Sequence, residues 1–142
     1  MIVEAGEAVK QTMKNPPSSP LLTWREVLAQ HKSLRGIAKN SLLADKGESG
    51  YRNVFLPDGR IVYVGEGLEG HQQPTGGNAV LLEALQTRRP LRVFLREGVN
   101  RWRDLGPYRV EGVEYRREAA EGRYVYWFTL APVESGGKFS TG

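Results

Sequence analysis

Apolar and polar positions alternate along residues 51–65 in the way expected of two strands that each bury one face. The segments YRNVFL (51–56) and RIVYVG (60–65) flank a Pro-Asp-Gly sequence at 57–59. Glycine at this place supplies the left-handed backbone conformation that a tight hairpin turn needs. The pattern therefore predicts a β-hairpin.

Three later segments are rich in β-branched and aromatic residues, as buried or half-buried strands are. They are PLRVFLRE (90–97), PYRVEGVEYRRE (107–118) and GRYVYWFTLAP (122–132). We expect Trp127, in the most apolar segment, to lie in the core. Trp102 lies between two arginines, and we expect it to stack or pack at the edge of a groove. With the hairpin, these segments predict an α+β domain built on a twisted, mostly antiparallel, barrel-like β-sheet with a few flanking helices.

Two segments have helical patterns. Thr23 followed by Glu26 matches a capping box, which predicts a helix over residues 23–32 whose tryptophan packs on the domain. Apolar residues at helical spacing predict a second helix over 78–87, with Asn78 available to cap it.

The length of 142 residues suits one domain with a single core. Residues 1–20 are polar and end in NPPSSP, which predicts a flexible N-terminal arm. Residues 135–142 have the composition of a flexible tail. The domain is therefore expected over residues 21–134. No run is apolar enough to span a bilayer and the N-terminus has no leader pattern, so we expect a cytoplasmic protein.

The sequence offers little for catalysis. It contains no cysteine, and its two histidines, His31 and His71, are far apart. Neither a thiolate metal site nor a recognisable nucleophile with its base is present, and the glycines of VGEGLEG do not form a phosphate-binding signature. We therefore predict no enzyme activity for this chain, no metal and no cofactor.

Positive charge is concentrated between residues 88 and 117. The whole chain has a net charge of +4, but this segment alone holds nine arginines and four acidic residues, a net charge of +5. Guanidinium groups suit bidentate contacts with phosphate, so one interpretation is contact with a polyanion. The other is an ordinary solvated face of the sheet.

Five motifs occur in an order that resembles the SRA domain, also called the YDG domain, which flips a modified cytosine out of DNA. The motifs are Gly50-Tyr51, Tyr63-Val64-Gly65, His71-Gln72 with Asn78, Pro90-Leu91-Arg92-Val93, and RDLGPY as a degraded form of the Tyr-Asp-Gly signature. They lie within residues 49–132. The resemblance implies a PUA-like fold and double-stranded DNA with a modified base, 5-methylcytosine or a related one, as the ligand.

The resemblance also implies which residues bind. The flipped base would stack between Tyr51 and Tyr63, where two aromatic faces replace its lost neighbours. The full set of base-binding candidates is Gly50, Tyr51, Asn53, Tyr63, Val64 and Gly65. The candidates for the DNA backbone are Gly67, His71, Gln72, Arg88, Arg89, Arg92, Arg101 and Arg103. For Gln72 and Asn78, amide hydrogen bonds that hold the loop are the alternative to DNA contact.

The sequence departs from the family at Val54, at Leu105, which lies next to Asp104 where the Tyr-Asp-Gly signature has its aspartate, and in the length of one loop. The family has an acid three residues after its first tyrosine, which accepts a hydrogen bond from the cytosine amino group, and Val54 lies there instead. Asn53, Asp58 or Glu66 would then have to supply the acceptor. The loop between Gly67 and His71 is short compared with eukaryotic members, whose loop fills the gap left by the base.

Bacterial relatives often join such a reader to a nuclease. The resemblance therefore implies the recognition part of a modification-dependent restriction system, with a nuclease partner and a nucleoid-associated location. Two other classes remain open on the sequence alone: a PUA-like RNA-binding module and a small protein-interaction domain.

Overall fold

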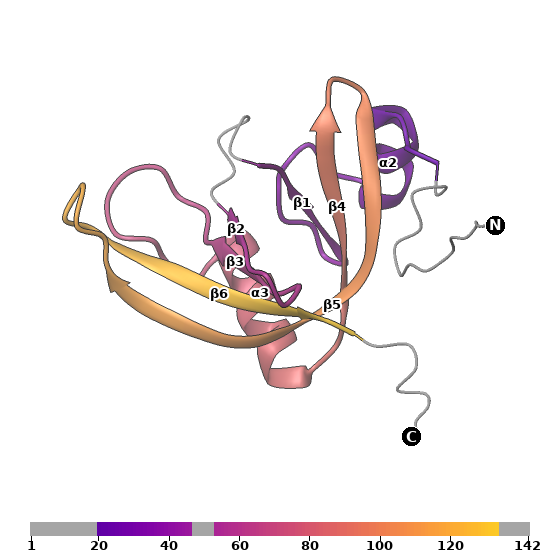
Figure 1. Ribbon diagram of the computed structural model, residues 1–142. Coiled ribbons are helices and arrows are strands. Elements are labelled where there is room, and N and C mark those ends of the chain that lie inside the picture. The colour runs from indigo at the N-terminus through magenta and orange to yellow at the C-terminus, as the bar shows by residue number, and fades with distance from the viewer. Residues whose placement is uncertain (1–19, 47–52, 134–142) are drawn as a thin grey trace.

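A single curled sheet forms most of the molecule (Figure 1). The computed structural model describes residues 20–46 and 53–133. The elements in chain order are α2 (Trp24–His31), β1 (Ser41–Ala44), β2 (Asn53–Phe55), β3 (Ile61–Val64), α3 (Gly76–Thr87), β4 (Leu91–Gly98), β5 (Arg101–Arg117) and β6 (Tyr124–Pro132). The six strands pair in the order β1-β4-β5-β6-β3-β2. Only the β1–β4 pair of this sheet is parallel, so the predicted α+β fold with a mostly antiparallel sheet is confirmed.

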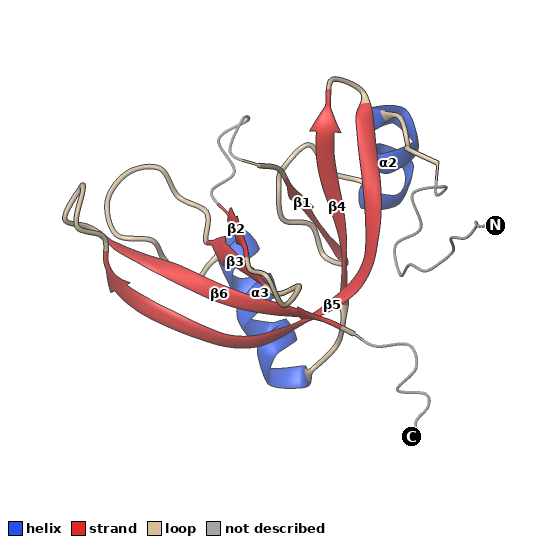
Figure 2. Cartoon of the chain, viewed as in Figure 1, coloured by secondary structure: helices blue, strands red, loops and turns tan. Residues whose placement is uncertain are grey.

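The long strand β5 belongs to both halves of the sheet. Its first part, up to Tyr108, pairs with β4, and from Tyr108 onward it pairs with β6. Register shifts in both ladders mark bulges, which bend strands and increase their twist. Figure 2 shows β5 running from the side of α2, past α3, to the far end of its hairpin with β6. The sheet is therefore curled into a half-barrel.

The predicted β2–β3 hairpin is confirmed. Asn53 pairs with Tyr63, and Phe55 pairs with Ile61. Gly59 has a φ of 93°, the left-handed conformation that the turn was expected to need.

One helix prediction is confirmed in detail and the other needs a correction. The Thr23 side chain accepts a hydrogen bond from the Glu26 amide, and the Glu26 carboxylate accepts one from the Thr23 amide, so α2 begins with the expected capping box. Helix α3 begins at Gly76, with Thr75 as its N-cap. The expectation that Asn78 caps this helix is wrong, because Asn78 lies inside the first turn and its side chain bonds elsewhere.

Apolar side chains of the described residues form two buried clusters. The larger lies between α3 and the curled sheet and includes Leu81, Ala84 and Phe128, each fully buried. The smaller lies beneath α2 and contains Trp102, whose ring centroid is 5.4 Å from that of Trp24. Trp102 is only 5% exposed, so the expectation that it stacks at the edge of a groove is wrong.

Trp127 is not a member of either core cluster. It alternates along β6 with Phe128, which takes the core-facing side, so the indole lies on the other face of the sheet. The Arg116 guanidinium is 4.4 Å from the centroid of its ring. The prediction of a core tryptophan is wrong because nearly every residue of this strand is apolar, so the sequence does not show which alternate side chains face the core. No helix in the described part of the chain has the length and apolarity needed to cross a membrane.

Candidate nucleic-acid interface

Asn53 and Tyr63 lie side by side on the inner face of the β2–β3 hairpin. They are directly paired in the antiparallel register, and directly paired residues project to the same face. The Tyr63 hydroxyl donates to the Leu43 carbonyl at 2.8 Å, which fixes the ring against β1. Tyr63 is 4% exposed. The first of the two expected tyrosines, Tyr51, lies outside the described residues, as does Gly50.

The Asn53 side chain presents a hydrogen-bond acceptor that has no partner among the described residues. Its amide nitrogen donates to the backbone carbonyl of Asp45, so the amide oxygen is the group left over. That oxygen is buried, and no described residue donates to it. Buried polar atoms are normally satisfied, and an exception of this kind indicates strain or a binding role. Asn53 is therefore placed to accept a hydrogen bond from a ligand on the Tyr63 side.

Val54, which takes the place of the family's acid, projects away from this face. It pairs with Val62 and is 53% exposed. Because strand side chains alternate, Asn53 and Val54 cannot both face Tyr63. The residue type at Val54 therefore has little influence on the inner face of the hairpin, where the available acceptor belongs to Asn53.

Two buried amides hold the loop that follows β3. Gln72 donates to the Gly65 carbonyl at 2.7 Å and accepts from the Tyr126 amide at 2.9 Å. Asn78 accepts from the Glu66 amide at 2.9 Å and donates to the Gln73 carbonyl at 2.9 Å. These side chains are 3% and 1% exposed. Of the two roles considered for them, the geometry supports holding the loop, and the Gln72 side chain has no group left for a DNA phosphate.

Gly65 is required by this packing. A Cβ at this position would lie 2.5 Å from the Asn78 amide oxygen and 2.7 Å from the Gln72 amide oxygen. Both distances are shorter than any ordinary contact, so a side chain would displace the amides that hold the loop. Gly65 therefore shapes this loop by its lack of a side chain, whereas the described residues give Val64 no contact of this kind beyond its pairing with Trp127.

A buried arginine closes the loop. Arg123 donates through one nitrogen to the carbonyls of Gly67 and Gly70, at 2.8 Å and 3.0 Å. Both glycines have positive φ, 120° and 68°. The segment between them presents Leu68, whose side chain is 89% exposed. A rigidly held turn thus exposes one apolar side chain to solvent.

His71 is exposed and its ring orientation is fixed. The Tyr124 amide donates to the His71 Nδ1 atom at 3.0 Å, and the two rings meet edge to face with centroids 5.5 Å apart. Because Nδ1 accepts, the neutral ring carries its proton on Nε2. His71 can therefore donate a hydrogen bond toward solvent from that atom.

The arginines expected at the DNA backbone lie at the C-terminal end of α3, on β4 and at the start of β5. Arg89 pairs with Glu83 at 2.7 Å, Arg92 with Asp104 at 2.8 Å, and Arg103 with Glu97 at 2.8 Å. The Arg103 hydrogen bond lowers the pKa of the Glu97 carboxyl, and the Arg89 hydrogen bond lowers that of Glu83. Arg88 and Arg101 are exposed, and the structure gives neither an ion pair with another described residue.

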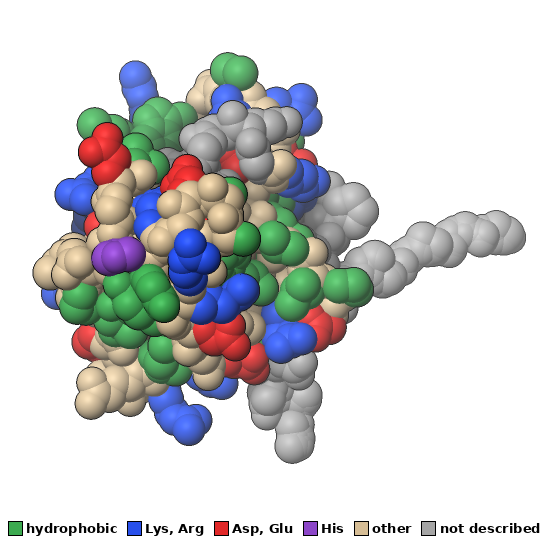
Figure 3. Space-filling view, turned by 90° about the vertical axis from the view of Figure 1, so that its left-hand side faces the viewer, with side chains coloured by type: hydrophobic (Ala, Val, Ile, Leu, Met, Phe, Trp, Pro, Cys, Tyr) green, Lys and Arg blue, Asp and Glu red, His purple; other side chains and the backbone are tan. Residues whose placement is uncertain are grey.

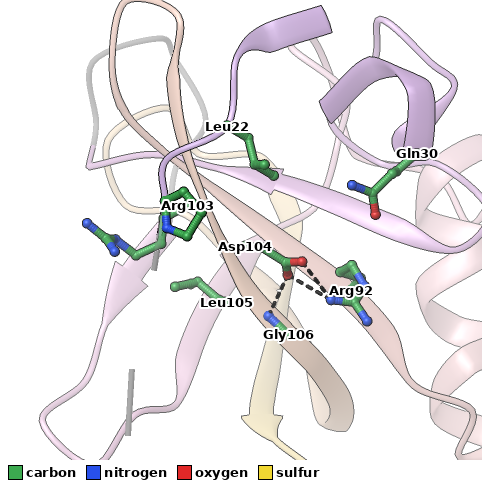
Figure 4. Close-up of a pocket in the computed structure, with 8 residues that line it drawn as sticks. Leu22, Gln30, Arg92, Arg103, Asp104, Leu105 and Gly106 are labelled. Carbon is green, nitrogen blue, oxygen red and sulfur yellow. Dashed lines mark hydrogen bonds and ion pairs between the residues drawn. The ribbon is translucent and has the colours of Figure 1, made fainter. Parts of the chain in front are cut away.

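The Arg92–Asp104 pair borders a hollow of about 390 Å³ (Figure 4). One Arg92 nitrogen contacts both oxygens of the Asp104 carboxylate, which also accepts from the Gly106 amide at 2.9 Å. The hollow lies on the α2 side, where Leu22 and Gln30 line it. Asp104 therefore neutralises Arg92 and holds the bulged backbone at Gly106 within the degraded signature sequence.

Sequence reasoning did not find Arg123 or Leu68. A buried arginine has no pattern of its own in the sequence. Leu68 had a usable signal, because it is the one large apolar residue in the segment GEGLEG. No group of three or more histidine, aspartate or glutamate side chains within the described ranges is arranged to hold a metal ion.

Solved structures with a similar fold include an SRA domain and a modification-dependent restriction endonuclease. The SUVH5 SRA domain in complex with methylated CHH DNA matches with a TM-score of 0.65 and 21% identity over 87% of this chain and 94% of that chain. The modification-dependent restriction endonuclease TagI matches with a TM-score of 0.67 and 21% identity, covering 84% of this chain and 50% of that chain. SUVH6 of Arabidopsis thaliana matches with a TM-score of 0.61 and 18% identity, covering 91% of this chain and 28% of that chain. At these identities the likeness establishes the fold.

The family follows from the sequence itself. The model of the ScoMcrA-like SRA domain family matches residues 30–139, which is most of the chain, and the protein belongs to that family. No curated protein matches it in sequence.

Proposed function

We propose that this domain binds double-stranded DNA and accepts one extruded base, a modified cytosine, on the inner face of the β2–β3 hairpin. The observation that carries the proposal is the buried amide oxygen of Asn53 beside Tyr63, which no described residue satisfies. Membership of the SRA family supports it. The SUVH5 neighbour is a complex with methylated DNA, which supports the same ligand class.

Asn53 supplies the hydrogen bond that the family obtains from an acid. The exocyclic amino group of cytosine is a donor, and a carboxamide oxygen is a suitable acceptor. The Asp45 carbonyl holds the other end of the amide, so the side chain cannot simply turn its nitrogen toward the base. A neutral acceptor also costs less to bury than a carboxylate when no base is bound.

Tyr63 provides one aromatic face for the base, and Tyr51 is proposed from the sequence as the other. Extrusion costs a few kcal/mol of lost stacking, which aromatic contacts replace. Because Tyr63 is 4% exposed, a base can stack on it only after one ring face becomes accessible. We therefore propose that local opening accompanies binding of the base.

Leu68 is proposed to fill the space that the base leaves in the duplex. Apolar side chains inserted between base steps stabilise unstacked DNA. Leu68 is 89% exposed, and the carbonyls on both sides of it are held by Arg123. Because the backbone around Leu68 is held, inserting its side chain costs little backbone freedom, which compensates for the shortness of the loop.

Within a restriction system, this domain would supply recognition and a nuclease elsewhere would supply cleavage. The TagI neighbour is a modification-dependent endonuclease, and this chain covers 50% of it, which supports such a division. We propose no catalytic residue in this chain.

The proposal is tested by fluorescence-polarisation binding near physiological salt. The duplexes are identical except for one base: cytosine, 5-methylcytosine, 5-hydroxymethylcytosine, a glucosylated cytosine or N6-methyladenine. We expect tighter binding to one modified cytosine, and we expect Asn53→Ala to weaken binding to that duplex by about 1–2 kcal/mol. Val54→Ala is the matched control, because it changes the neighbouring residue on the opposite face. Equal binding of the native protein to every duplex would refute the proposal.

The role of Leu68 has a separate test. Leu68→Ala is expected to weaken binding to the modified duplex, and to weaken it less when the base opposite the modification is already missing. Val99→Ala is the control, because Val99 is 79% exposed at the β4–β5 turn in the other half of the molecule. The same loss on both duplexes would contradict insertion by Leu68.

A further inference from the structure

The β5–β6 hairpin carries a row of aromatic rings that the base site does not use. Tyr115 contacts Tyr124 with ring centroids 5.4 Å apart, and contacts Tyr126 with centroids 4.5 Å apart. Tyr126 stacks on the core residue Phe128, at 5.8 Å and an interplanar angle of 20°. At the outer end, His71 meets Tyr124 edge to face. The row runs without a break from the core to the surface.

The outer rings of this row are exposed. Tyr124 is 40% exposed and Tyr115 is 46% exposed. Figure 3, which views the molecule from the side of this hairpin, shows a histidine bordered by hydrophobic side chains. Cross-strand contact alone explains why two tyrosines adjoin. It does not explain why their faces remain open to solvent next to the loop that presents Leu68.

The row is held rigid by the same loop. The Tyr115 hydroxyl donates to the Gln72 carbonyl at 2.9 Å, and the Tyr124 amide donates to His71 Nδ1. The described residues give the Tyr124 side chain no hydrogen bond. A rigid aromatic surface loses little entropy when a flat ligand stacks on it, and every nucleobase has a flat face.

The surrounding charge permits a nucleic acid at this position. Arg116 is compensated by Glu114 at 2.9 Å and lies over Trp127 on the other face of the sheet. Arg117, two residues after Tyr115, is exposed, and the described residues give it no ion pair. The acidic residue Glu121 is paired with Arg123 at 2.7 Å. Backbone phosphates would therefore find beside the rings a cation that no described acid neutralises.

We propose that Tyr124 and Tyr115, with His71 at their edge, form a stacking platform for an unpaired nucleobase of the bound DNA. The proposal rests on the proposed function in one respect, because extrusion of a base from a duplex leaves its former partner unpaired. Stacking recognises the flat face of a base and is indifferent to its identity. The platform is thus distinct from the Asn53 site, which recognises a particular base.

The test uses the full chain and two probes that have the same number of phosphates. One is an unmodified single-stranded DNA of about ten nucleotides, a length chosen from the site sizes of single-strand binders. The other is an abasic chain of equal length. We expect the base-bearing chain to bind about tenfold tighter, as base–aromatic stacking predicts. Tyr124→Ala should remove this preference, and Tyr124→Phe should retain it.

Two further variants keep the test decisive. Val99→Ala is the control, because Val99 is 79% exposed and lies at the β4–β5 turn, outside the platform and the base site. If Tyr124→Ala does not fold, Tyr124→Leu keeps the apolar packing and removes the flat ring. Equal binding of the two probes by the native protein would overturn the proposal, and so would an unchanged preference in the variant that lacks the ring. Neither result depends on whether the domain distinguishes modified from plain duplexes.

Discussion

The two halves of the curled sheet differ in how they hold their arginines. In the half formed by β2, β3, β6 and the loop between β3 and α3, Arg123 is buried and, like Gln72 and Asn78, donates to backbone carbonyls. In the half formed by β1, β4 and the start of β5, arginines lie at the surface and pair with acids, as Arg92 and Arg103 do. The number of arginines in a segment therefore does not by itself locate the site that we propose.

The largest expected difference is in the free energy of unfolding when one arginine is removed from each half. Arg123→Met should lower the free energy of unfolding by about 3–5 kcal/mol, because it frees two carbonyls and leaves the Glu118 carboxylate buried with one partner fewer. Arg92→Met should cost less than about 1 kcal/mol, because its ion pair with Asp104 is exposed. Urea unfolding measures both. Equal losses would show that the two halves do not differ in this way.

A smaller difference is expected between two glycines. Gly65→Ala should cost about 2–3 kcal/mol, because the new Cβ would overlap the amide oxygens of Asn78 and Gln72. Gly112→Ala should change stability by less than about 0.5 kcal/mol, because no atom of the described residues lies within 4 Å of the Cβ that it adds. Thermal unfolding followed by circular dichroism compares them. A tolerated alanine at residue 65 would mean that the amides can move, and with them the loop.

The fold was largely predictable because its determinants are local. The capping box at Thr23 and the Pro-Asp-Gly turn are each determined by a few neighbouring residues, and both form as expected. The parallel pairing of β1 with β4 was not predictable, since the residues that pair are about 50 positions apart and no turn joins them. Trp102, expected at the edge of a groove, is buried, and Trp127, expected in the core, belongs to neither core cluster. Both expectations were wrong because burial depends on which side of a strand faces the core.

The site was predictable only in part, for a related reason. A motif names residue types at given spacings, but the face of each side chain depends on strand pairing. Asn53 and Val54 illustrate this. The family's spacing puts its acid at Val54, whereas the register pairs Asn53, with its unpartnered amide oxygen, with Tyr63. The role of Arg123 arises from contacts 53 and 56 residues away, which no local pattern contains.

A pH dependence is expected from His31, which supports the backbone that receives the Tyr63 hydroxyl. Its Nε2 donates to the Arg35 carbonyl at 2.7 Å, and its Nδ1 contacts the Ser41 hydroxyl at 2.6 Å. Burial lowers the pKa of His31 below its ordinary value of 6.5, although the bond to Arg35 opposes the shift. The unfolded chain therefore binds the proton first as the pH falls. The contribution of His31 to the free energy of unfolding should be fully present above pH 6.5. It should decrease as the pH drops from that value toward the lowered pKa.

His31→Gln tests this dependence. The glutamine amide retains a donor and an acceptor but does not titrate in this range, so we expect the decrease in stability between about pH 7 and pH 5 to become smaller. The substitution itself should cost about 1–2 kcal/mol at neutral pH, because the two hydrogen bonds will be less well aligned. Urea unfolding at several pH values gives both quantities. A native and a variant protein with parallel pH profiles would exclude His31 as the source.

The smallest effects are expected from the arginines of the second half, and they decide whether that half touches DNA at all. Arg101 is exposed and unpaired among the described residues, whereas Arg92 is already neutralised by Asp104. If this half contacts phosphates, Arg101→Ala should weaken binding to every duplex by less than about 1 kcal/mol and reduce the salt slope by about one. Arg92→Ala should change the slope less, because in the native protein a phosphate would have to compete with Asp104 for the Arg92 guanidinium. Binding measured across a salt series separates the two. An unchanged slope in both variants would restrict DNA contact to the half that contains Asn53 and Leu68, and the arginine-rich segment would then be an ordinary solvated face.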